Sequence, residues 1–210
     1  MRPDLFYDIL RNSPLFGGKL SEGVVGTLQI ITDTYYAEYL PTGDPEHLAY
    51  ILATAYHESF SFRYNPDWKP IREGYAKTNA AAIRHVAELR MTGAISKNYA
   101  LPNRDGKSFY GRGWVQTTHE RNYLVMGKRI GLDLVSDPDL LLQPGPAAKA
   151  LVIGSVEGLY TGKKLSDYDT PDGMLDAYNA RRVINGLDKA EKIKGDYEIF
   201  HLAVSRAIAG

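Results

Sequence analysis

The sequence predicts a mainly α-helical protein with one minor strand element. Apolar residues recur at helical spacing in several stretches, and glycine or proline separates these stretches. The chain has 210 residues, of which 44% are hydrophobic, so it can bury one full core. The sequence has no internal repeat, no low-complexity segment and no shift of composition, so we expect residues 1–210 to form one domain.

The first two helices are predicted by their N-terminal signals. Residues 1–20 are expected to form an N-terminal arm, and Ser21 is a plausible N-cap of a helix that runs to about Leu40. Asp44 is an N-cap candidate for the next helix, and Pro45 occupies its first position. These signals place the start of the second helix more firmly than its end.

The remaining helices are predicted by apolar periodicity between glycine and proline residues. They cover approximately residues 79–92, 114–130, 146–160, 171–183 and 189–208. Residues 94–113 are polar and rich in turn residues, so the expected strand element is a small β-hairpin there. A segment of this length without regular structure is unusual in a compact domain unless it is functional, which makes it a candidate wall of a cleft.

A single carboxyl group lies on the apolar face of the second helix. Leu48, Ile51, Leu52 and Ala55 recur at helical spacing, and at about 100° per residue Glu58 falls within roughly 20° of Ile51. A carboxyl among apolar groups resists ionisation, and general acid chemistry requires a carboxylic acid that keeps its proton. The alternative is a helix-terminal glutamate that pairs with an arginine.

Composition and charge exclude several classes of protein. The 25 basic and 25 acidic residues cancel, which argues against a general nucleic-acid binder. The sequence has no cysteine, so disulfides and thiolate metal sites are excluded. It shows no secretory signal and no stretch of roughly 18 apolar residues that would span a membrane. The 15 tyrosines would suit sugar binding, but composition alone favours ordinary core and surface roles.

A second informative stretch runs from Phe109 to Tyr123. Two glycines flank Arg112 and allow close approach of the backbone. Gln116, Thr118 and Asn122 then recur near helical spacing as a polar line, which suits a hydrated groove. A glycine turn that leads into a helix with an exposed face explains the same spacing equally well.

No metal, phosphate or cofactor site is expected. His57 precedes Glu58 as in zinc proteases, but Ser61 stands where the second histidine of that motif belongs. The other histidines show no ligand spacing, and neither a phosphate-binding glycine loop nor the nucleophile elbow of serine hydrolases is present.

Four runs of residues together resemble glycoside hydrolase family 19, which includes plant chitinases and many phage endolysins. They are Tyr56–Ser59, Tyr110–Thr118 with Asn122-Tyr123, Thr161–Tyr168 and Ala180–Gly186. The resemblance spans roughly residues 45–200. It implies a lysozyme-like helical fold with two lobes around a cleft. It also implies that a β-1,4 bond to an N-acetylated amino sugar is hydrolysed with inversion.

The resemblance also implies roles for individual residues. Glu58 matches the general acid, and Glu73 resembles the general base of bacterial and phage members, with Asp67 as the alternative. Inversion needs these carboxyl groups about 6.5–9.5 Å apart, with a water molecule held by the base. Thr118 matches the residue that helps to hold this water. Arg72, next to Glu73, would help to keep the base ionised.

Further residues are expected to contact the sugar chain or support the acids. The substrate-binding candidates are His57, Tyr110, Arg112, Gln116, Asn122, Tyr123 and Asn185. Arg112 and Arg182 could pair with the two acids. For the arginines and Tyr123 a purely structural role is at least as plausible.

Chitin and peptidoglycan share the β-1,4 amino-sugar backbone, so the polymer has to be inferred from other features. The chain lacks cysteine, a signal peptide and a separate wall-binding or chitin-binding module. These features favour a phage or prophage endolysin that is made in the host cytoplasm as a monomer. It would reach the periplasm and cell wall by holin-dependent release and lyse the cell there, without stable membrane insertion. Its partner would be the glycan strands of peptidoglycan, and no nucleic acid.

Three alternatives remain open at this point. The chain could act on chitin or chitooligosaccharides. It could be a glycan-binding protein that has lost catalysis. It could also be a lytic transglycosylase, which works with one catalytic carboxyl and would not need Glu73.

Overall fold

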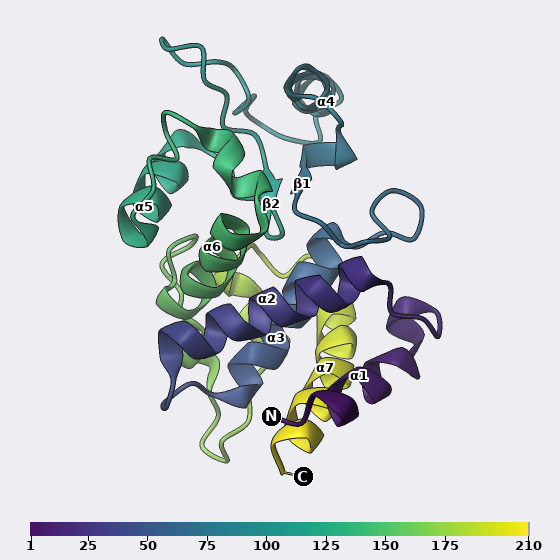
Figure 1. Ribbon diagram of the computed structural model, residues 1–210. Coiled ribbons are helices and arrows are strands. Elements are labelled where there is room, and N and C mark those ends of the chain that lie inside the picture. The colour runs from purple at the N-terminus through teal and green to yellow at the C-terminus, as the bar shows by residue number, and fades with distance from the viewer. Residues whose placement is uncertain (210) are drawn as a thin grey trace.

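Helices form most of the chain, and the only strands among residues 1–209, which the computed structural model describes, make one small sheet (Figure 1). The α-helices are α1 Pro3–Arg11, α2 Glu22–Tyr39, α3 Pro45–Ser59, α4 Asn79–Met91, α5 Glu120–Ile130, α6 Pro144–Glu157 and α7 Ala190–Ala209. The strands are β1 Ile71–Arg72 and β2 Arg112–Gly113. Short 3-10 turns are η1 Pro14–Phe16, η2 Glu73–Tyr75, η3 Pro138–Leu142, η4 Leu165–Tyr168 and η5 Asn179–Val183. The predicted helical fold class is confirmed.

The larger lobe is built around α3, which is buried on nearly every side. Its residues from Leu48 to Ala53 and Ala55 are almost fully buried, and they pack with α1, α2, α6 and α7 in one hydrophobic core. The most extensive helix packing in the molecule joins α3 to α7. Because α3 is central, its buried residues follow one helical period, which is why the sequence predicted this helix and its apolar face.

The smaller lobe contains α4, α5, β1 and β2, which lie above the larger lobe in Figure 1. Two separate hydrophobic clusters stabilise it. One lies beneath α4 and includes Val86 and Tyr110, and the other lies between α5 and α6 and includes Tyr123 and Met126. Small local cores therefore support this lobe, whereas Trp114 and Val115, which follow β2, belong to the main core.

The N-terminal arm is in fact mostly helical. Phe6 and Leu10 of α1 are buried, and α1 packs against α7. The backbone N–H of Arg2 donates to the carbonyl oxygen of Ala207 at 2.7 Å, which joins the two ends of the chain. The sequence analysis assigned no secondary structure to this arm, and the helix forms where the apolar residues of α1 pack against a helix far away in the sequence.

The predicted minor strand element is present as one small antiparallel sheet, but it is not a local hairpin within residues 94–113. A tight turn forms where the Gly106 N–H donates to the Asn103 carbonyl oxygen at 3.0 Å, but no strands flank it. Instead β2 pairs antiparallel with β1, so that Ile71 lies opposite Gly113. The sheet thus joins segments that are distant in sequence, which turn signals cannot reveal.

Two predicted helices differ from the structure. Residues 114–119 are irregular because Gln116 and His119 adopt positive φ angles of 54° and 66°, so α5 begins only at Glu120. Residues 171–178 form a loop, since the Thr170 N–H donates to the Met174 carbonyl oxygen at 2.8 Å and closes a turn. Only η5 remains of the helix expected at 171–183. No helix in the described part of the chain is both long and apolar enough to cross a bilayer.

Candidate active site

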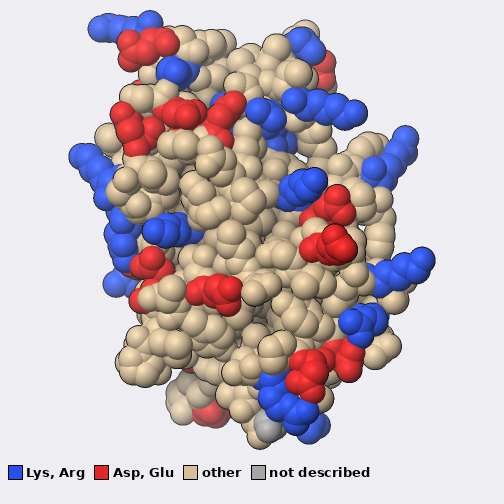
Figure 2. Space-filling model, viewed as in Figure 1, with Lys and Arg blue, Asp and Glu red and all other residues tan. Residues whose placement is uncertain are grey.

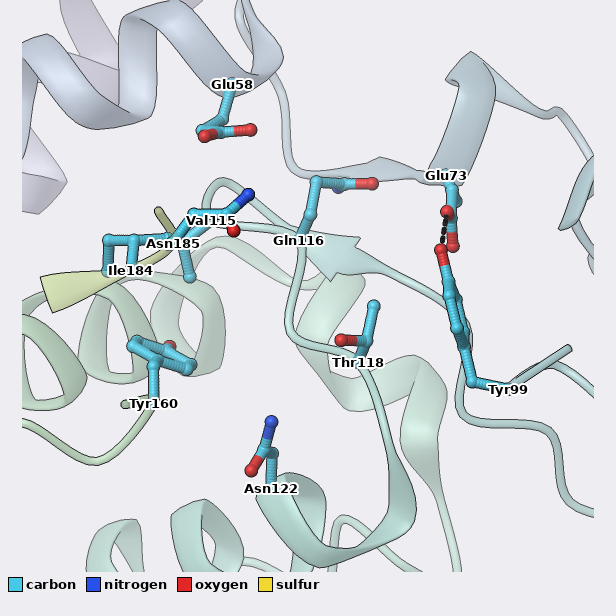
Figure 3. Close-up of a pocket in the computed structure, with 10 residues that line it drawn as sticks. All are labelled: Glu58, Glu73, Tyr99, Val115, Gln116, Thr118, Asn122, Tyr160, Ile184 and Asn185. Carbon is cyan, nitrogen blue, oxygen red and sulfur yellow. Dashed lines mark hydrogen bonds between the residues drawn. The ribbon is translucent and has the colours of Figure 1, made fainter. Parts of the chain in front are cut away.

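A cavity of about 370 Å³ brings together residues from both lobes (Figure 3). Its lining comes from the end of α3, from η2, from the segment before β2, from residues 115–122 and from the segments after α6 and η5. The residues are Glu58, Glu73, Tyr99, Val115, Gln116, Thr118, Asn122, Tyr160, Ile184 and Asn185. Six of these are predicted site residues, so the cavity is the candidate active site.

Glu58 projects into this cavity from the last turn of α3 (Figure 3). Its side chain is 20% exposed, and Oε1 lies 2.6 Å from a guanidinium nitrogen of Arg181, which is 4% exposed. The carboxyl is therefore not surrounded by apolar groups alone. The alternative in which a helix-terminal glutamate pairs with an arginine describes the contact that the structure shows.

The arginine that pairs with Glu58 is Arg181, and the prediction of Arg182 was wrong. In η5 the side chain of Arg181 turns inward, and its Nε donates to the carbonyl oxygen of Asp188 at 3.1 Å. Arg182 is exposed, and its carbonyl oxygen accepts from the hydroxyl of Thr161 at 2.7 Å. A sequence cannot readily distinguish adjacent arginines when a short turn decides which one faces the core.

The last turn of α3 is held by several side chains. Trp68 Nε1 donates to Ser59 Oγ at 3.0 Å, and Asn65 Nδ2 donates to the Ser59 carbonyl oxygen at 2.8 Å. The Tyr56 hydroxyl donates to the Leu15 carbonyl oxygen at 2.5 Å. The backbone that carries Glu58 is thus fixed to the N-terminal segment and to the loop that follows α3.

Glu73 enters the cavity from η2 on the other side (Figure 3). One carboxylate oxygen accepts from the Gly111 N–H at 2.8 Å, and the other accepts from the Tyr99 hydroxyl. Burial, and then the contact with Glu73, raise the pKa of Tyr99, so the phenol remains a donor. A Cβ at Gly74, where φ is 64°, would lie 2.7 Å from the His85 ring, so the turn after Glu73 requires glycine.

Asp67, the alternative second carboxylate, does not line the cavity. It accepts from the Ser21 hydroxyl at 3.2 Å and lies 3.7 Å from the ammonium of Lys69. Because Glu73 shares the cavity with Glu58 and Asp67 does not, the geometry favours Glu73 as the partner of Glu58.

The polar line of the sequence reaches the cavity, although its first part is not helical. Gln116 Nε2 donates to the carbonyl oxygens of Gly113 at 3.0 Å and Ile71 at 3.3 Å, which fixes the amide between the two strands. Thr118 and Asn122 lie across the cavity from Glu58 in Figure 3. Hydroxyl and amide groups are therefore arranged opposite the carboxyl of Glu58.

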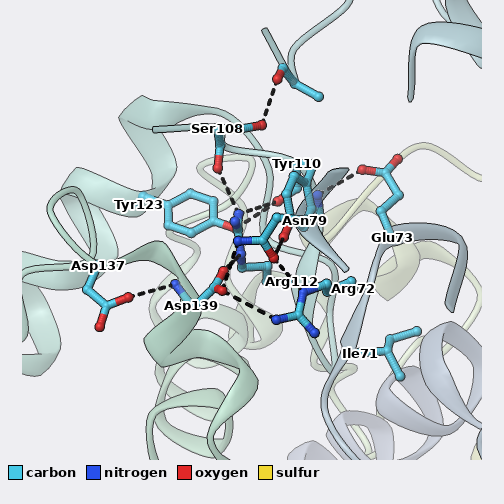
Figure 4. Close-up of polar contacts among 12 residues, drawn as sticks. Ile71, Arg72, Glu73, Asn79, Ser108, Tyr110, Arg112, Tyr123, Asp137 and Asp139 are labelled. Carbon is cyan, nitrogen blue, oxygen red and sulfur yellow. Dashed lines mark hydrogen bonds and ion pairs between the residues drawn. The ribbon is translucent and has the colours of Figure 1, made fainter. Parts of the chain in front are cut away.

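Tyr110, Arg112 and Tyr123 do not line the cavity, which corrects their predicted contact with substrate. All three are buried, and Arg112 is only 2% exposed (Figure 4). Arg112 Nε donates to Asp139 at 2.8 Å, and its Nη1 donates to the Ser108 carbonyl oxygen at 2.9 Å. The guanidinium stacks 3.6 Å from the centre of the Tyr110 ring. These residues support the sheet from behind.

Arg72 belongs to the same polar network, at its more exposed edge, and does not pair with Glu73. Its Nε donates to Asn79 Oδ1 at 2.7 Å, and its Nη2 donates to Asp139 at 3.3 Å (Figure 4). Tyr110 donates to the same Asn79 oxygen at 2.7 Å. Asp139 therefore connects both arginines of the paired strands, a role that no motif in the sequence indicated.

His57 is absent from the cavity lining as well, so its predicted contact with substrate is corrected. Its imidazole faces Asp196 on α7, with Nδ1 3.9 Å from Oδ2. Burial, reinforced by the charges of Lys192 and Arg181, lowers the pKa of His57 to about 4. The ring is therefore neutral near pH 7.

One group of side chains in the described residues has the spacing of metal ligands. The ligand atoms of Asp44, His47 and Asp169 lie within 4.8 Å of one another. They stand at the first turn of α3, whereas Glu58 is in its last turn, and His47 Nε2 is hydrogen-bonded to Asp169 at 2.7 Å. The arrangement is separate from the candidate active site.

Comparison with known proteins identifies relatives of the chain. The sequence pattern of the class I chitinases, glycoside hydrolase family 19, matches residues 46–150. An endochitinase of Arabidopsis thaliana is 33% identical over 106 residues, which cover 50% of this chain and 30% of that protein. An endochitinase of Brassica napus is 30% identical over 115 residues, which cover 43% of this chain and 34% of that protein. The chain thus spans about a third of the length of these relatives.

The fold also has a known counterpart. The crystal structure of a bacterial family 19 chitinase aligns with 96% of this chain and 93% of its own, with a TM-score of 0.51 and 19% sequence identity. At this identity the alignment establishes the fold alone. The sequence match covers half of the chain and shows the family independently of this alignment. The chain belongs to glycoside hydrolase family 19, the family of the class I chitinases.

Proposed function

We propose that the protein hydrolyses the β-1,4 glycosidic bonds of bacterial peptidoglycan by an inverting mechanism with two carboxyl groups. The observation that carries this proposal is the entry of Glu58 and Glu73 into one polar cavity from opposite lobes. Each carboxyl has different partners: a guanidinium contacts Glu58, whereas a phenol and a backbone N–H donate to Glu73. Two carboxyl groups in different surroundings suit the two different roles that inversion requires.

Glu58 is the general acid in this mechanism. Arg181 occupies Oε1, so the proton for the leaving group is carried by Oε2. As the bond between the anomeric carbon and the glycosidic oxygen breaks, that proton passes to the oxygen. Arg181 then stabilises the carboxylate that remains, since it is already in contact with it.

Glu73 is the general base. Both of its oxygens accept hydrogen bonds, which is the role of an ionised carboxylate. A water molecule between Glu73 and Thr118 attacks the anomeric carbon from the face opposite the leaving group, and its proton passes to Glu73. Gln116, Asn122 and Asn185 supply amide groups for the N-acetyl and hydroxyl groups of the sugars.

Peptidoglycan is favoured as the polymer by two sequence features. The Thr161–Tyr168 run and the loop that contains Glu73 resemble the bacterial and phage members of the family, and the chain lacks cysteine. In this proposal the protein is an endolysin that acts on the cell wall as a monomer and lyses the host. Chitin is the second candidate, because the Arabidopsis thaliana and Brassica napus relatives are endochitinases.

The test is mass spectrometry of the products from purified peptidoglycan, with chitin hexasaccharide as a parallel substrate. New reducing ends on muramic acid indicate a muramidase, and those on glucosamine indicate a glucosaminidase. Products from chitin alone would replace the proposed substrate by the second candidate. An anhydro-muramic end would contradict hydrolysis and indicate a transglycosylase. Binding without any product would indicate a glycan-binding protein.

A further inference from the structure

Two buried polar atoms face each other directly behind the candidate acid. His57, the residue before Glu58, has its Nδ1 3.9 Å from Oδ2 of Asp196 on α7, and each side chain is 13% exposed. Neither atom has a hydrogen-bond partner among the described residues. Among the described residues, neither side chain has another partner of opposite charge type within 4.0 Å.

An unpartnered buried polar atom is costly, so such atoms in a native protein ask for a physical explanation. Here the two atoms are complementary, because an imidazole nitrogen can donate or accept and a carboxyl oxygen can do the same. The 3.9 Å between Nδ1 and Oδ2 is longer than a hydrogen bond, so a direct bond between them requires one of the two side chains to move. The two residues form a matched pair that links α3 to α7.

The charges around this pair come from three elements. Lys192 of α7 contributes to the electrostatics of both residues. Arg181, Asp188 and Lys189, from η5 and the segment before α7, act on His57. From α3, Tyr56 lies close enough to Asp196 that the carboxylate contributes to the raised pKa of its phenol. Glu58, also on α3, already pairs with Arg181.

Burial perturbs the two members in opposite directions. It raises the pKa of Asp196 to about 6 and lowers the pKa of His57 to about 4. Above pH 6 a neutral imidazole can donate from Nδ1 to the carboxylate. Between pH 4 and 6 the protonated carboxyl can donate to Nδ1. One proton is therefore available between the two atoms over the whole range.

We propose that His57 and Asp196 share one proton in a hydrogen bond and act as a positioning pair that fixes the last turn of α3 and thereby orients Glu58. Neither residue touches the substrate. Arg181 holds the Glu58 carboxyl from the side of η5, and the pair holds the adjacent residue from the side of α7. The proposal rests on the proposed function for its catalytic consequence, but the pair itself can be tested without substrate.

Matched variants separate the effect of the hydrogen bond from the effect of side-chain volume. Asparagine at position 57 places an amide nitrogen where Nδ1 lies, whereas glutamine extends its amide to the position of Nε2. We therefore expect His57→Asn to keep the pair and His57→Gln to lose it. For the partner, Asp196→Asn keeps a hydrogen bond and Asp196→Leu removes it at similar volume. Glu198→Gln, which changes an exposed carboxyl on the same helix, is the control.

The first measurement is a double-mutant cycle of unfolding for His57→Gln and Asp196→Leu. We expect the two changes to be coupled by about tenfold in the unfolding equilibrium constant at pH 7. A coupling factor near one would show that His57 and Asp196 do not interact and would overturn the proposal.

The pH dependence of unfolding tests whether burial perturbs the pKa values of the two groups in opposite directions. In His57→Gln the carboxyl of Asp196 remains, with a folded-state pKa raised from 3.8 to about 6, so its contribution to stability is present below pH 4 and is lost as the pH rises through 6. In Asp196→Leu the imidazole remains, with a pKa lowered from 6.5 to about 4, so its contribution is present above pH 6.5 and is lost as the pH falls to 4. In the wild type these opposite slopes largely cancel, and equal slopes in all three proteins would contradict the burial of the two groups, whereas the double-mutant cycle decides whether they form a pair.

The second measurement is steady-state kinetics on the polymer that the wild type cleaves. We expect His57→Gln and Asp196→Leu to lower kcat about tenfold with KM within about twofold, because misplaced catalytic groups slow chemistry more than binding. The two asparagine variants and the control should keep kcat within about twofold. If His57→Gln and Asp196→Leu lower the stability but leave kcat unchanged, the positioning role is overturned and the contact between the two residues is purely structural. If the wild type cleaves neither polymer, the proposed function and the positioning role both fail, while the cycle still decides whether the pair exists.

Discussion

The two candidate catalytic carboxyl groups are held in contrasting ways. Glu58 projects from a helix that is packed in the main core, and its partner is the buried guanidinium of Arg181. Glu73 projects from a 3-10 turn after a two-residue strand, and its partners are a phenol and a backbone N–H. The first group is positioned by regular secondary structure, whereas the second depends on contacts from distant segments.

This contrast divides the work of positioning between the lobes. The position of Glu58 should tolerate changes in the smaller lobe, because α3 belongs to the core that α1, α2, α6 and α7 share. The position of Glu73 should depend on the network around Arg112 and Asp139, which lies directly behind β1 and β2 (Figure 4). Variants in each lobe can therefore disturb the position of one carboxyl group without disturbing the other.

The charge distribution on the visible face is mixed, which fits a protein without net charge (Figure 2). Basic and acidic side chains alternate over both lobes, and neither sign covers a lobe by itself. Attraction of a polymer by the whole surface is therefore not expected, and specificity should lie in the cavity.

The largest effect is expected for Glu58→Gln. Removal of the proton donor should lower kcat by about 10³-fold or more while the fold is retained, since general acid catalysis is worth about 10² to 10⁴. Loss of turbidity of bacterial cell walls measures the activity, and circular dichroism checks the fold. Glu22→Gln, an exposed change in the first turn of α2, is the control. Full activity of Glu58→Gln would exclude it as the acid.

A nearly equal effect is expected for Glu73→Gln, with kcat lower by about 10²- to 10³-fold because the attacking water loses its base. Initial rates on the soluble products of wall digestion measure it. Asp67→Asn is the matched comparison, since Asp67 lies outside the cavity lining, and it should keep activity within about twofold. The opposite ranking would transfer the role of base to Asp67.

Asp139→Asn should act on stability more than on chemistry. It leaves the buried Arg112 guanidinium without its carboxylate and should cost about 2 kcal/mol, less than a fully buried pair because Asp139 is about one-third exposed. Urea unfolding at pH 7 measures this cost. Asp137→Asn, a change of the neighbouring N-cap of η3, is a control with an expected cost below about 1 kcal/mol.

The same pair has a defined pH dependence. Burial alone would raise the pKa of Asp139, but the hydrogen bond from Asn79 and the charge of Arg112 more than offset it and hold that pKa below 3.8. The contribution of Asp139 to stability is therefore present above pH 3.8 and is lost as the pH falls through the lowered value. The difference in unfolding free energy between wild type and Asp139→Asn should shrink below pH 4, and a difference that is constant with pH would contradict the ion pair.

The smallest effect is expected for Tyr99→Phe, which removes one of the two hydrogen bonds to Glu73. The variant should lower kcat about threefold to tenfold and the stability by about 1 kcal/mol, the usual net value of one hydrogen bond. Tyr64→Phe, a change of an exposed tyrosine outside the cavity lining, should change neither quantity. Equal rates for Tyr99→Phe and wild type would show that Gly111 alone orients Glu73.

The sequence was most informative where a helix is buried. The apolar stripe of α3 revealed the placement of Glu58, because a central helix imposes one period over many residues. Arg181 was missed because a short 3-10 turn, and not a period, determines which of two adjacent arginines faces inward. Distance along the chain was the second obstacle, since β1 and β2 pair across about forty residues.

Charged and aromatic residues near a motif were the least predictable part of the site. Arg112 was expected to contact the substrate or to pair with one of the acids, but it is buried because Tyr110 stacks on it and Asp139 neutralises it. Asp139 lies 27 residues further along the chain, so no local pattern links the two. Tyr99, in contrast, lies in residues 94–113, which the sequence indicated as a cleft wall without identifying the side chain.

The most direct test of the two-carboxylate mechanism is the anomeric form of the first product. Proton NMR during hydrolysis of a soluble β-1,4 oligosaccharide, released from peptidoglycan or derived from chitin, resolves α and β reducing ends before they equilibrate. A water molecule delivered by Glu73 opposite the leaving group that Glu58 protonates gives the α-anomer first. Initial formation of the β-anomer, or of an anhydro end without a new reducing sugar, would contradict the mechanism.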